Sequence, residues 1–300
     1  MNILTFDIEE WFHILDHKST KTEKEWLNYE YRLDANMDRI FELLDRKNQK
    51  ATFFCLGWVA REFPHILKKI DSMGFEIASH SDKHQLVYEQ SRTEFRADLD
   101  NSIKSMEDTV GKKVRAYRAP GFSVVEENRW IFEELINYGI ELDCSVFPTK
   151  RAHGGLSNYK NNEPSIINVA DNLTIKEFPI NTFNMGIKKI IFSGGGYFRL
   201  LPYWIIDLLF KRSNYVMTYF HPRDFDKSQP IIQDLSNIRK FKSYYGLDMA
   251  FYKLEKLITD FDFIDLDEAN KRVDWNSMKT IDLFSEEKYS LSKKRVPYKI

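Results

Sequence analysis

The sequence of 300 residues predicts an α/β fold, more specifically a distorted (β/α) barrel of seven or eight parallel strands. Two observations predict this fold. Short apolar segments alternate with longer helix-like segments over most of the chain, which is typical of parallel strands joined by helices. Polar residues able to do chemistry also occur where predicted strands end, and the carboxyl ends of barrel strands form the catalytic face.

The predicted strands are mostly continuous apolar runs rather than strict alternations of apolar and polar residues. Such runs are expected for strands that are covered on both faces. The segments with this character are 2–8, 51–57, 74–80, 114–120, 139–147, 174–180, 215–221 and 262–266.

Helical spacing of apolar residues occurs between several of these strands. The clearest helix is predicted over 92–110, where Ser91 and Glu94 form a capping-box pattern and Gly111 can end the helix. Pro64 is expected to divide or kink a second helix. That helix and the remaining ones are predicted at 58–73, 126–138, 199–212 and 249–260.

These segments predict one barrel domain over residues 1–273. Residues 154–174 are rich in Gly, Asn, Ser and Pro, which predicts a long loop. Residues 274–300 are charged and weakly patterned, which predicts a C-terminal appendage rather than an independent domain.

Composition narrows the classes of function. A formal net charge of −1 gives no basic face for a nucleic-acid partner, and the 15% aromatic content slightly favours a sugar-like ligand. Cys55 and Cys144 lie in apolar runs, which predicts buried free thiols. We find no signal-peptide pattern and no apolar run of the roughly 20 residues that span a bilayer, so we expect a cytoplasmic protein.

Two acidic residues close the first predicted strand, in "TFDIEEW". Because side chains alternate faces along a strand, Asp7 and Glu9 point the same way. Two carboxylates on one face repel each other unless a cation or a proton lies between them. Taken alone, the pair is explained equally well by solvated acids at the end of a strand.

Two histidines follow another strand, in "HSDKH". His80 ends the strand and His84 follows a short turn. Alone, this pair is better explained by surface histidines in a polar turn. Together with Glu9 it supplies two imidazoles and one carboxylate, a common catalytic ligand set for Zn²⁺ that leaves a position open to water.

Three further polar residues follow other strands, and each has a purely structural alternative. Arg118 could keep a neighbouring carboxylate ionised, or be a surface arginine before a proline turn. Asp143 could orient a histidine, or simply end a strand. His221 could act as a general acid, because imidazole titrates near neutrality, or be a hydrogen-bonded histidine before a prolyl turn.

The motifs "TFDIEEW", "HSDKH", "RAPGF", "DCSVFP" and "YFHP" occur in the order typical of the polysaccharide deacetylase family. The sequence resembles this family from Asp7 to about Ala269. The segments "GGGYFRLLPYW" and "HPRDFDKSQP" further resemble a subgroup associated with bacterial exopolysaccharide and surface-glycan synthesis. The resemblance implies a distorted (β/α) barrel that removes acetyl groups with a divalent metal.

The resemblance also implies roles for the metal-binding residues. His80 and His84 would bind the ion, and Asp7 would be the catalytic base. The common family pattern has two adjacent aspartates, of which the second is a ligand, but Ile8 occupies that position here and cannot ligate. The strand-face argument nominates Glu9 instead, with Glu10 as the alternative.

The remaining roles follow from the same resemblance. Arg118 would hold Asp7, and His221 would be the acid, supported by Asp143. Gly121 would donate its main-chain N–H to the oxyanion. Residues expected to line the oxyanion and substrate site with Gly121 are Pro120 and Tyr197.

The expected cofactor is one divalent ion, with Zn²⁺ first and Co²⁺ or Fe²⁺ as alternatives. The expected substrate is an acetamido sugar on a polymer, lipid or nucleotide carrier, used in bacterial surface polysaccharide synthesis, and the oligomeric state is left open. Arg199 could meet a phosphate or uronate, although the glycines before it equally indicate a tight connection. Two alternatives remain: hydrolysis of another non-peptide C–N bond, such as a formamide or cyclic amide, and a catalytically silent carbohydrate-binding relative.

Overall fold

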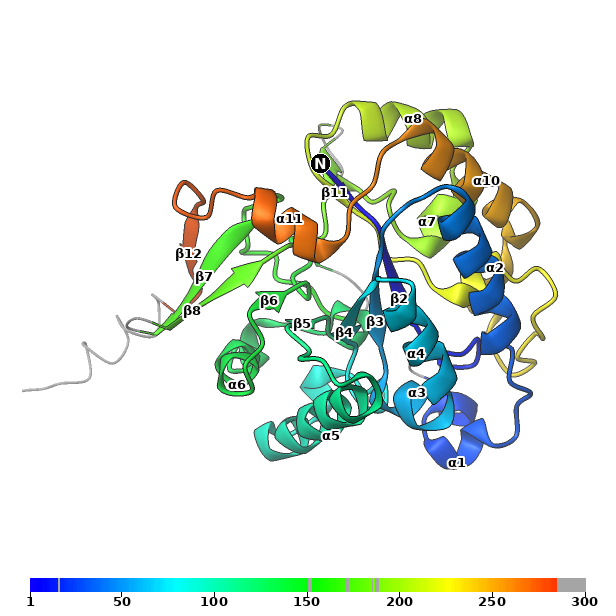
Figure 1. The fold of residues 1–300 in the computed structure, drawn as a ribbon, viewed down its shortest axis with the longest axis horizontal. Coiled ribbons are helices and arrows are strands. Elements are labelled where there is room, and N and C mark those ends of the chain that lie inside the picture. The colour runs from blue at the N-terminus through cyan, green and yellow to red at the C-terminus, as the bar shows by residue number, and fades with distance from the viewer. Residues whose placement is uncertain (16, 151–152, 171–172, 185, 187–188, 285–300) are drawn as a thin grey trace, which may run out of the picture.

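The computed structural model describes residues 1–284 apart from 16, 151–152, 171–172, 185 and 187–188. Its centre is a sheet of eight strands in the order β12-β7-β8-β6-β5-β4-β3-β2 (Figure 1). Neighbouring strands in this sheet are parallel, except that β7 and β8 are antiparallel. The strands are β2 (Thr5–Ile8), β3 (Thr52–Cys55), β4 (Glu76–Ser79), β5 (Ala116–Tyr117), β6 (Leu142–Asp143), β7 (Ser165–Ala170), β8 (Leu173–Glu177) and β12 (Thr280–Asp282).

A short parallel pair lies beside the first strand of this sheet. β1 (Asn2–Ile3) pairs with β11 (Val216–Met217), and a single parallel bridge joins Phe6 to Phe220. A separate antiparallel pair consists of β9 (Phe183–Asn184) and β10 (Lys189–Ile190). The α/β fold class with a mostly parallel sheet is therefore confirmed, whereas closure of the strands into a complete barrel stays a prediction.

Helices flank the sheet, and Figure 1 shows α3, α4 and α5 beside β3 and β4. Among the described residues, none of the helices is both long enough and apolar enough to cross a bilayer. The helices are α1 (Glu23–Trp26), α2 (Leu33–Arg46), α3 (Gly57–Glu62), α4 (Pro64–Ser72), α5 (Arg92–Val110), α6 (Ile131–Asn137), α7 (Gly195–Leu200), α8 (Tyr203–Lys211), α9 (Asn237–Tyr244), α10 (Leu247–Asp260) and α11 (Leu266–Arg272).

Helix ends with strong local signals lie where the sequence predicts them. Ser91 and Glu94 form the capping box of α5, and Gly111 ends this helix in the left-handed region at φ 68°. Pro64 is the first residue of α4 and separates it from α3, because proline is tolerated in the first helical turn but not in the interior.

Other segments differ from the prediction. The helix expected over 199–212 is two helices, α7 and α8, because Pro202 interrupts it. The strand expected over 262–266 makes only an isolated bridge from Ile264 to Ile3, and Asp265 instead caps α11 by accepting from the main-chain N–H of Glu268 at 2.8 Å.

The loop predicted over 154–174 contains a strand. Ser165–Ala170 forms β7, which pairs antiparallel with β8. Part of the predicted C-terminal appendage also joins the sheet, because β12 pairs with β7. Residues 285–300 lie outside the described residues.

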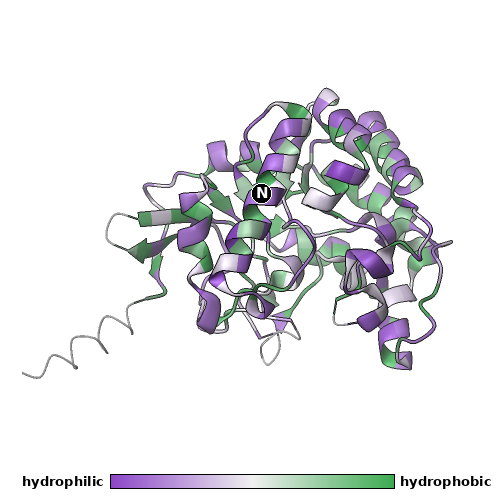
Figure 2. Cartoon of the chain, turned by 90° about the horizontal axis from the view of Figure 1, so that it is seen from below, coloured by the Kyte–Doolittle hydropathy of each residue, from purple (hydrophilic) through white to green (hydrophobic). Residues whose placement is uncertain are grey.

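Neighbouring residues of a central strand face different parts of the core. Phe53 and Cys55 belong to one buried apolar cluster and Phe54 to another. Both faces of the strand are therefore covered, which explains its continuous apolar sequence. Figure 2 shows apolar segments along the strands and more polar segments on the surrounding helices. Cys55 and Cys144 are buried free thiols, as predicted.

Candidate metal centre and active site

The predicted site residues lie where parallel strands end. Asp7 is in β2 and Glu9 directly follows this strand, His80 directly follows β4, and Arg118 directly follows β5. His221 follows β11 and lies next to Phe220, which bridges to β2. Because carboxyl ends of neighbouring parallel strands meet at one edge of a sheet, residues far apart in the chain come together there.

Three of these side chains form a possible metal site. Glu9, His80 and His84 each offer one ligand atom, and these atoms all lie within 4.8 Å of one another. Nε2 of His84 lies 2.6 Å from Oε2 of Glu9. Within the described residues, this buried oxygen has no donor in hydrogen-bond geometry. A divalent cation between the two side chains would satisfy it, so the donor set fits such an ion.

The tautomer of His80 also suits a metal ligand. Its Nδ1 lies 2.8 Å from the main-chain oxygen of Arg118. A carbonyl can only accept, so Nδ1 carries the proton and Nε2 is the free nitrogen. Burial lowers the pKa of His80 to about 4, although the negative charge of Asp7 opposes this change. The ring is therefore neutral near pH 7, as a metal ligand must be.

The turn that carries His84 is held by helix α5. Ser81 and His84 have positive φ angles of 74° and 57°, which non-glycine residues seldom adopt. Ser81 Oγ accepts the main-chain N–H of His84 at 3.0 Å. Asp98 of α5 accepts the main-chain N–H groups of Asp82 and Lys83 at 2.9 and 3.2 Å. These hydrogen bonds offset the backbone strain and fix the position of the imidazole.

Glu10 has a different role from Glu9. One carboxylate oxygen of Glu10 accepts the main-chain N–H groups of Arg32 and Leu33 at 2.8 and 2.9 Å, and the other accepts the N–H of Trp11 at 3.2 Å. The side chain is thus committed to the start of α2. Of the two candidate ligands that the sequence leaves open, the geometry places Glu9 beside the histidines.

Asp7 and Arg118 form a buried ion pair. Nη1 of Arg118 donates to Oδ1 of Asp7 at 2.6 Å and to the hydroxyl of Thr5 at 2.8 Å. The guanidinium carbon lies 4.0 Å from the ring centroid of Phe54. The predicted contact between Arg118 and Asp7 is present, and it fixes the orientation of the carboxylate.

His221 lies on the other side of Asp7. Its Nε2 is 3.8 Å from Oδ2 of Asp7 and 3.7 Å from Oε1 of Glu9. Its Nδ1 is 3.0 Å from Oδ2 of Asp224, which also accepts the main-chain N–H of His221 at 2.9 Å. Burial opposes the charged ring, but the carboxylates of Glu9, Asp224 and Asp7 outweigh it and raise the pKa of His221 to about 9.

Asp143 was expected to support His221, but in the structure it contacts Ser145 instead. Asp143 accepts from the hydroxyl of Ser145 at 2.6 Å and from its main-chain N–H at 3.1 Å. Asp224 occupies the supporting position, because it lies one turn of 3-10 helix after His221 in Pro222–Phe225. The H-x-x-D spacing in "HPRD" is the sequence signal that identifies it.

His13 is a further residue that sequence reasoning missed. Its buried ring is stacked on His84 with centroids 5.8 Å apart, and its Nδ1 accepts the main-chain N–H of Glu10 at 3.3 Å. The only sequence signal is its position four residues after Glu9.

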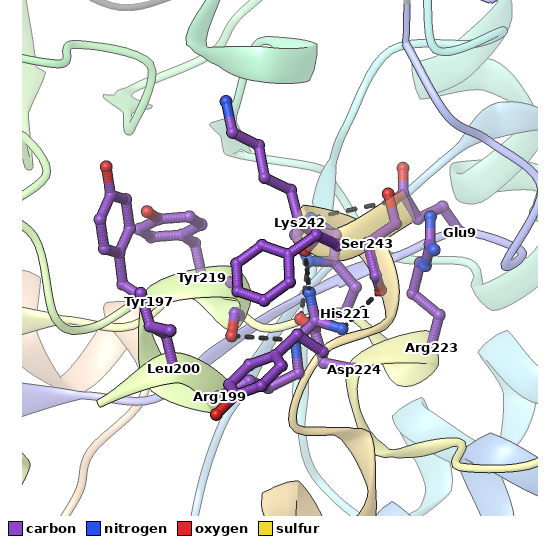
Figure 3. A pocket seen from close by; sticks show the side chains of 14 residues that line it. Glu9, Tyr197, Arg199, Leu200, Tyr219, His221, Arg223, Asp224, Lys242 and Ser243 are labelled. Carbon is purple, nitrogen blue, oxygen red and sulfur yellow. Dashed lines mark hydrogen bonds and ion pairs between the residues drawn. The ribbon is translucent and has the colours of Figure 1, made fainter. Parts of the chain in front are cut away.

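A cavity of about 480 Å³ opens beside Glu9 and His221 (Figure 3). Tyr197 and Tyr219 contribute to its wall, so Tyr197 lies where the sequence predicts a substrate contact. Other aromatic lining residues are Phe241 and Tyr245.

Gly121 has a conformation that only glycine adopts readily. It lies between Pro120 and Phe122 with φ 60°, and a Cβ there would come within 2.7 Å of Leu15 Cδ1. The expected role of Gly121 and Pro120 at an oxyanion stays a prediction.

Comparisons with protein families divide the chain into two segments. Residues 17–139 match the family model "Polysaccharide deacetylase", and residues 144–271 match "Domain of unknown function (DUF3473)". The first segment contains His80, His84 and Arg118, and the second contains His221 and Asp224. The proposed site therefore draws on both segments and on the strand that precedes them.

Two characterised relatives match part of the chain. A peptidoglycan-N-acetylglucosamine deacetylase from Bacillus cereus is 29% identical over 97 residues, which are 32% of this chain and 35% of that protein. A bifunctional xylanase/deacetylase from Pseudobutyrivibrio xylanivorans is 29% identical over 91 residues, which are 30% of this chain and 15% of that protein. The chain thus matches well under half the length of either relative.

The fold is similar to a solved structure over nearly its full length. A crystal structure of a protein from Mycobacterium smegmatis, described as a polysaccharide deacetylase, superposes with a TM-score of 0.64 at 16% identity. The match covers 93% of this chain and 91% of that one. At this identity the likeness establishes a shared fold.

Proposed function

We propose that the chain, whose residues 17–139 match the polysaccharide deacetylase family, hydrolyses the N-acetyl group of an acetamido sugar with one divalent metal ion. The observation that carries the proposal is the arrangement of Glu9, His80 and His84 with Asp7 and His221 beside them. A binding protein without activity would have no chemical need for all five groups together.

Glu9, His80 and His84 would hold the metal ion, and we propose Zn²⁺ because two imidazoles and one carboxylate are a common catalytic set for it. When bound, such an ion polarises an acyl oxygen and lowers the pKa of water. The tautomer of His80 and the closeness of the Glu9 carboxylate to the His84 imidazole support this assignment.

Asp7 is the base in this proposal. The guanidinium of Arg118 holds Oδ1 and leaves Oδ2 on the side of His221. The hydrogen bond from Arg118 fixes the orientation of the carboxylate. Asp7 can therefore accept a proton from the attacking water, as general-base catalysis requires.

His221 is the acid. The raised pKa keeps the imidazole protonated near pH 7. Asp224 holds Nδ1, so that Nε2 faces Asp7 and Glu9. A protonated Nε2 can donate to the departing amine, which would otherwise leave as an unstable anion.

The cavity supports a carbohydrate substrate. Its volume, about 480 Å³, lies within the range of sites for small ligands. Tyr197, Tyr219, Phe241 and Tyr245 provide apolar faces with polar edges, which suit the faces and hydroxyls of a sugar ring. We propose that this sugar belongs to a bacterial surface polysaccharide or its precursor.

Metal analysis combined with acetate release tests the function. We expect protein purified without added metal to contain one divalent ion per chain and to release acetate from N-acetylglucosamine oligomers. A Glu9→Ala variant should lose both properties. If the protein contains metal and releases no acetate, but cleaves a formamide or cyclic amide, the deacetylase proposal is wrong and the protein hydrolyses another non-peptide C–N bond. Absence of metal and of acetate release would leave a silent carbohydrate-binding protein.

A further inference from the structure

Arg223 is a buried cation that the proposed mechanism does not use. It lies in the 3-10 helix that follows His221 and lines the cavity (Figure 3). Arg223 is 9% exposed. Within the described part of the chain, its Nη2 has no hydrogen-bond partner and no carboxylate lies within 4.0 Å of its guanidinium. The guanidinium carbon of Arg223 lies 5.9 Å from the ring centroid of Tyr244.

Arg199, the other arginine of the cavity, is in the opposite situation. Its Nη1 donates to the main-chain oxygen of Ser243 at 2.6 Å, its Nη2 to that of Lys242 at 2.9 Å, and its Nε to that of Gly195 at 3.2 Å. These bonds tie α7 to α9. Arg199 therefore holds the wall of the cavity together and has little capacity left for a ligand, which favours the tight connection over anion binding, the two alternatives that its sequence leaves open.

The carboxylates nearest to Arg223 already have partners. Asp224 binds His221 and lies 3.5 Å from Arg199, and Glu9 lies against His84. Burial, and then the positive charge of Arg199, lower the pKa of Arg223, and the nearby carboxylates of Asp224 and Glu9 only partly oppose this change. A guanidinium stays charged in a protein, and a buried charge without a counter-ion is costly. The free protein thus keeps in the cavity wall a buried guanidinium whose Nη2 has no hydrogen-bond partner among the described residues.

A second cation lies on the same cavity. Lys242 is exposed, lines the cavity, and has no ion pair among those of the described residues. Figure 3 shows its side chain pointing away from Arg199 and Asp224. Two positive groups therefore face one cavity that also contains the reactive groups Glu9 and His221.

We propose that Arg223 and Lys242 form a subsite for an anionic substituent, a phosphoryl group or a carboxylate, carried by the substrate next to its acetamido sugar. The substrate would then be a phosphorylated sugar, or an acetamido sugar beside a uronate, rather than a neutral oligomer. Guanidinium and ammonium groups bind both kinds of oxyanion through charge-assisted hydrogen bonds. The proposal rests on the proposed function for the identity of the sugar, but the anion subsite can be tested by binding alone.

The test compares the affinities of three ligands by titration calorimetry in the metal-loaded protein. The ligands are methyl N-acetylglucosaminide, N-acetylglucosamine 1-phosphate, and a disaccharide of glucuronate and N-acetylglucosamine. We expect at least one anionic ligand to bind about 10-fold or more tightly than the neutral one, because a hydrogen bond to a charged group contributes more than a neutral one. The preferred ligand distinguishes phosphoryl from carboxylate.

Substitutions test which residues cause the preference for the anionic ligand. Arg223→Gln should remove most of the preference for the anionic ligand, and Lys242→Gln should reduce it. Arg212→Gln is the matched control, because Arg212 is exposed at the end of α8, outside the cavity, and should keep the preference. If Arg223→Gln does not fold, the preference of the Lys242→Gln variant for the anionic ligand provides the test, because Lys242 is exposed.

Equal affinities for neutral and anionic ligands in the wild-type protein would overturn the proposal. A preference that persists in a folded Arg223→Gln protein, or in Lys242→Gln if Arg223→Gln does not fold, would overturn it too. Because acetate release is not the readout, failure of the deacetylase proposal is recognised separately: the anionic preference would remain while no acetate forms.

Discussion

At the residue scale, two carboxylates two positions apart acquire different chemistry from different partners. Asp7 is held by the permanent cation of Arg118, whereas Glu9 lies against the imidazole of His84. Their common strand face brings them together, and their different neighbours are the reason that we propose Asp7 as a proton acceptor and Glu9 as a metal ligand.

Replacing Asp7 by Asn should reduce turnover on the order of 100-fold or more, because the amide cannot accept a proton from water. Metal content should be unchanged, since Asp7 is outside the ligand set. Steady-state kinetics and metal analysis on the same sample check both points. Wild-type turnover in this variant would exclude Asp7 as the base.

The pH dependence of activity should report His221. The folded-state pKa is raised to about 9 from an ordinary value of 6.5, so the acid form persists to alkaline pH. Turnover should therefore fall as the pH rises through about 9. Any stabilisation from the charged ring is complete below pH 6.5 and is lost over the same alkaline range.

Asp224→Asn should lower turnover by about 10- to 100-fold, because the carboxylate that orients Nδ1 is lost. It should also move the alkaline fall of the pH–rate profile to lower pH, since one charge that favours the protonated ring is gone. Asp143→Asn provides the comparison. An alkaline limb that moves with Asp143 and not with Asp224 would contradict the assignment.

At the scale of elements, α2 depends on a residue from outside the helix. Glu10 accepts the N–H groups of Arg32 and Leu33, 22 and 23 positions later in the chain. Arg32, the residue before the helix, makes no side-chain cap of its own. The main-chain N–H groups at the start of α2 are thus satisfied by the segment that also carries the proposed metal ligand Glu9.

Glu10→Ala should reduce the free energy of unfolding by about 1–3 kcal/mol, because buried main-chain donors lose their acceptor. Chemical denaturation of the wild type and the variant measures this. The metal content of the folded variant should persist, unlike that of Glu9→Ala. Loss of metal in Glu10→Ala with retention in Glu9→Ala would reverse the ligand assignment.

At the scale of the whole molecule, β2 and the segment that follows β11, far apart in the chain, meet at the site. The main-chain N–H of Asp7 donates to the oxygen of Phe220 at 2.7 Å, and the N–H of Thr5 donates to the hydroxyl of Thr218 at 2.8 Å. The acid and the base are therefore neighbours only when the second family segment is folded against the first strand.

Metal removal should lower the thermal midpoint of unfolding. Glu9 and the two histidines follow different strands, so a shared ion binds the folded chain and not the unfolded one. Zinc at 100 times its dissociation constant would add about 2.7 kcal/mol. Thermal scans with chelator and with zinc measure this, and the Glu9→Ala protein should show no zinc-dependent shift. An equal shift in that variant would place the ion elsewhere.

The parts of the fold that the sequence predicts well are those with local causes. The ends of α5 follow from Ser91, Glu94 and Gly111, and the break before α4 follows from Pro64. The strand β7 and the edge strand β12 were not predicted, because pairing with neighbouring strands, and not a pattern in their own short sequences, makes them strands.

By itself, the sequence determined the α/β class, the positions of the chemical groups at strand ends, and the choice of two histidines and an acid. These follow from periodicity and from the chemistry of each side chain. Only the tertiary structure decided that Asp224 rather than Asp143 supports His221, that Glu10 accepts hydrogen bonds at the start of α2, and that Arg223 rather than Arg199 has a guanidinium nitrogen without a hydrogen-bond partner among the described residues. Such partners are chosen by distance in space between segments that the chain keeps far apart, and no local pattern records that distance.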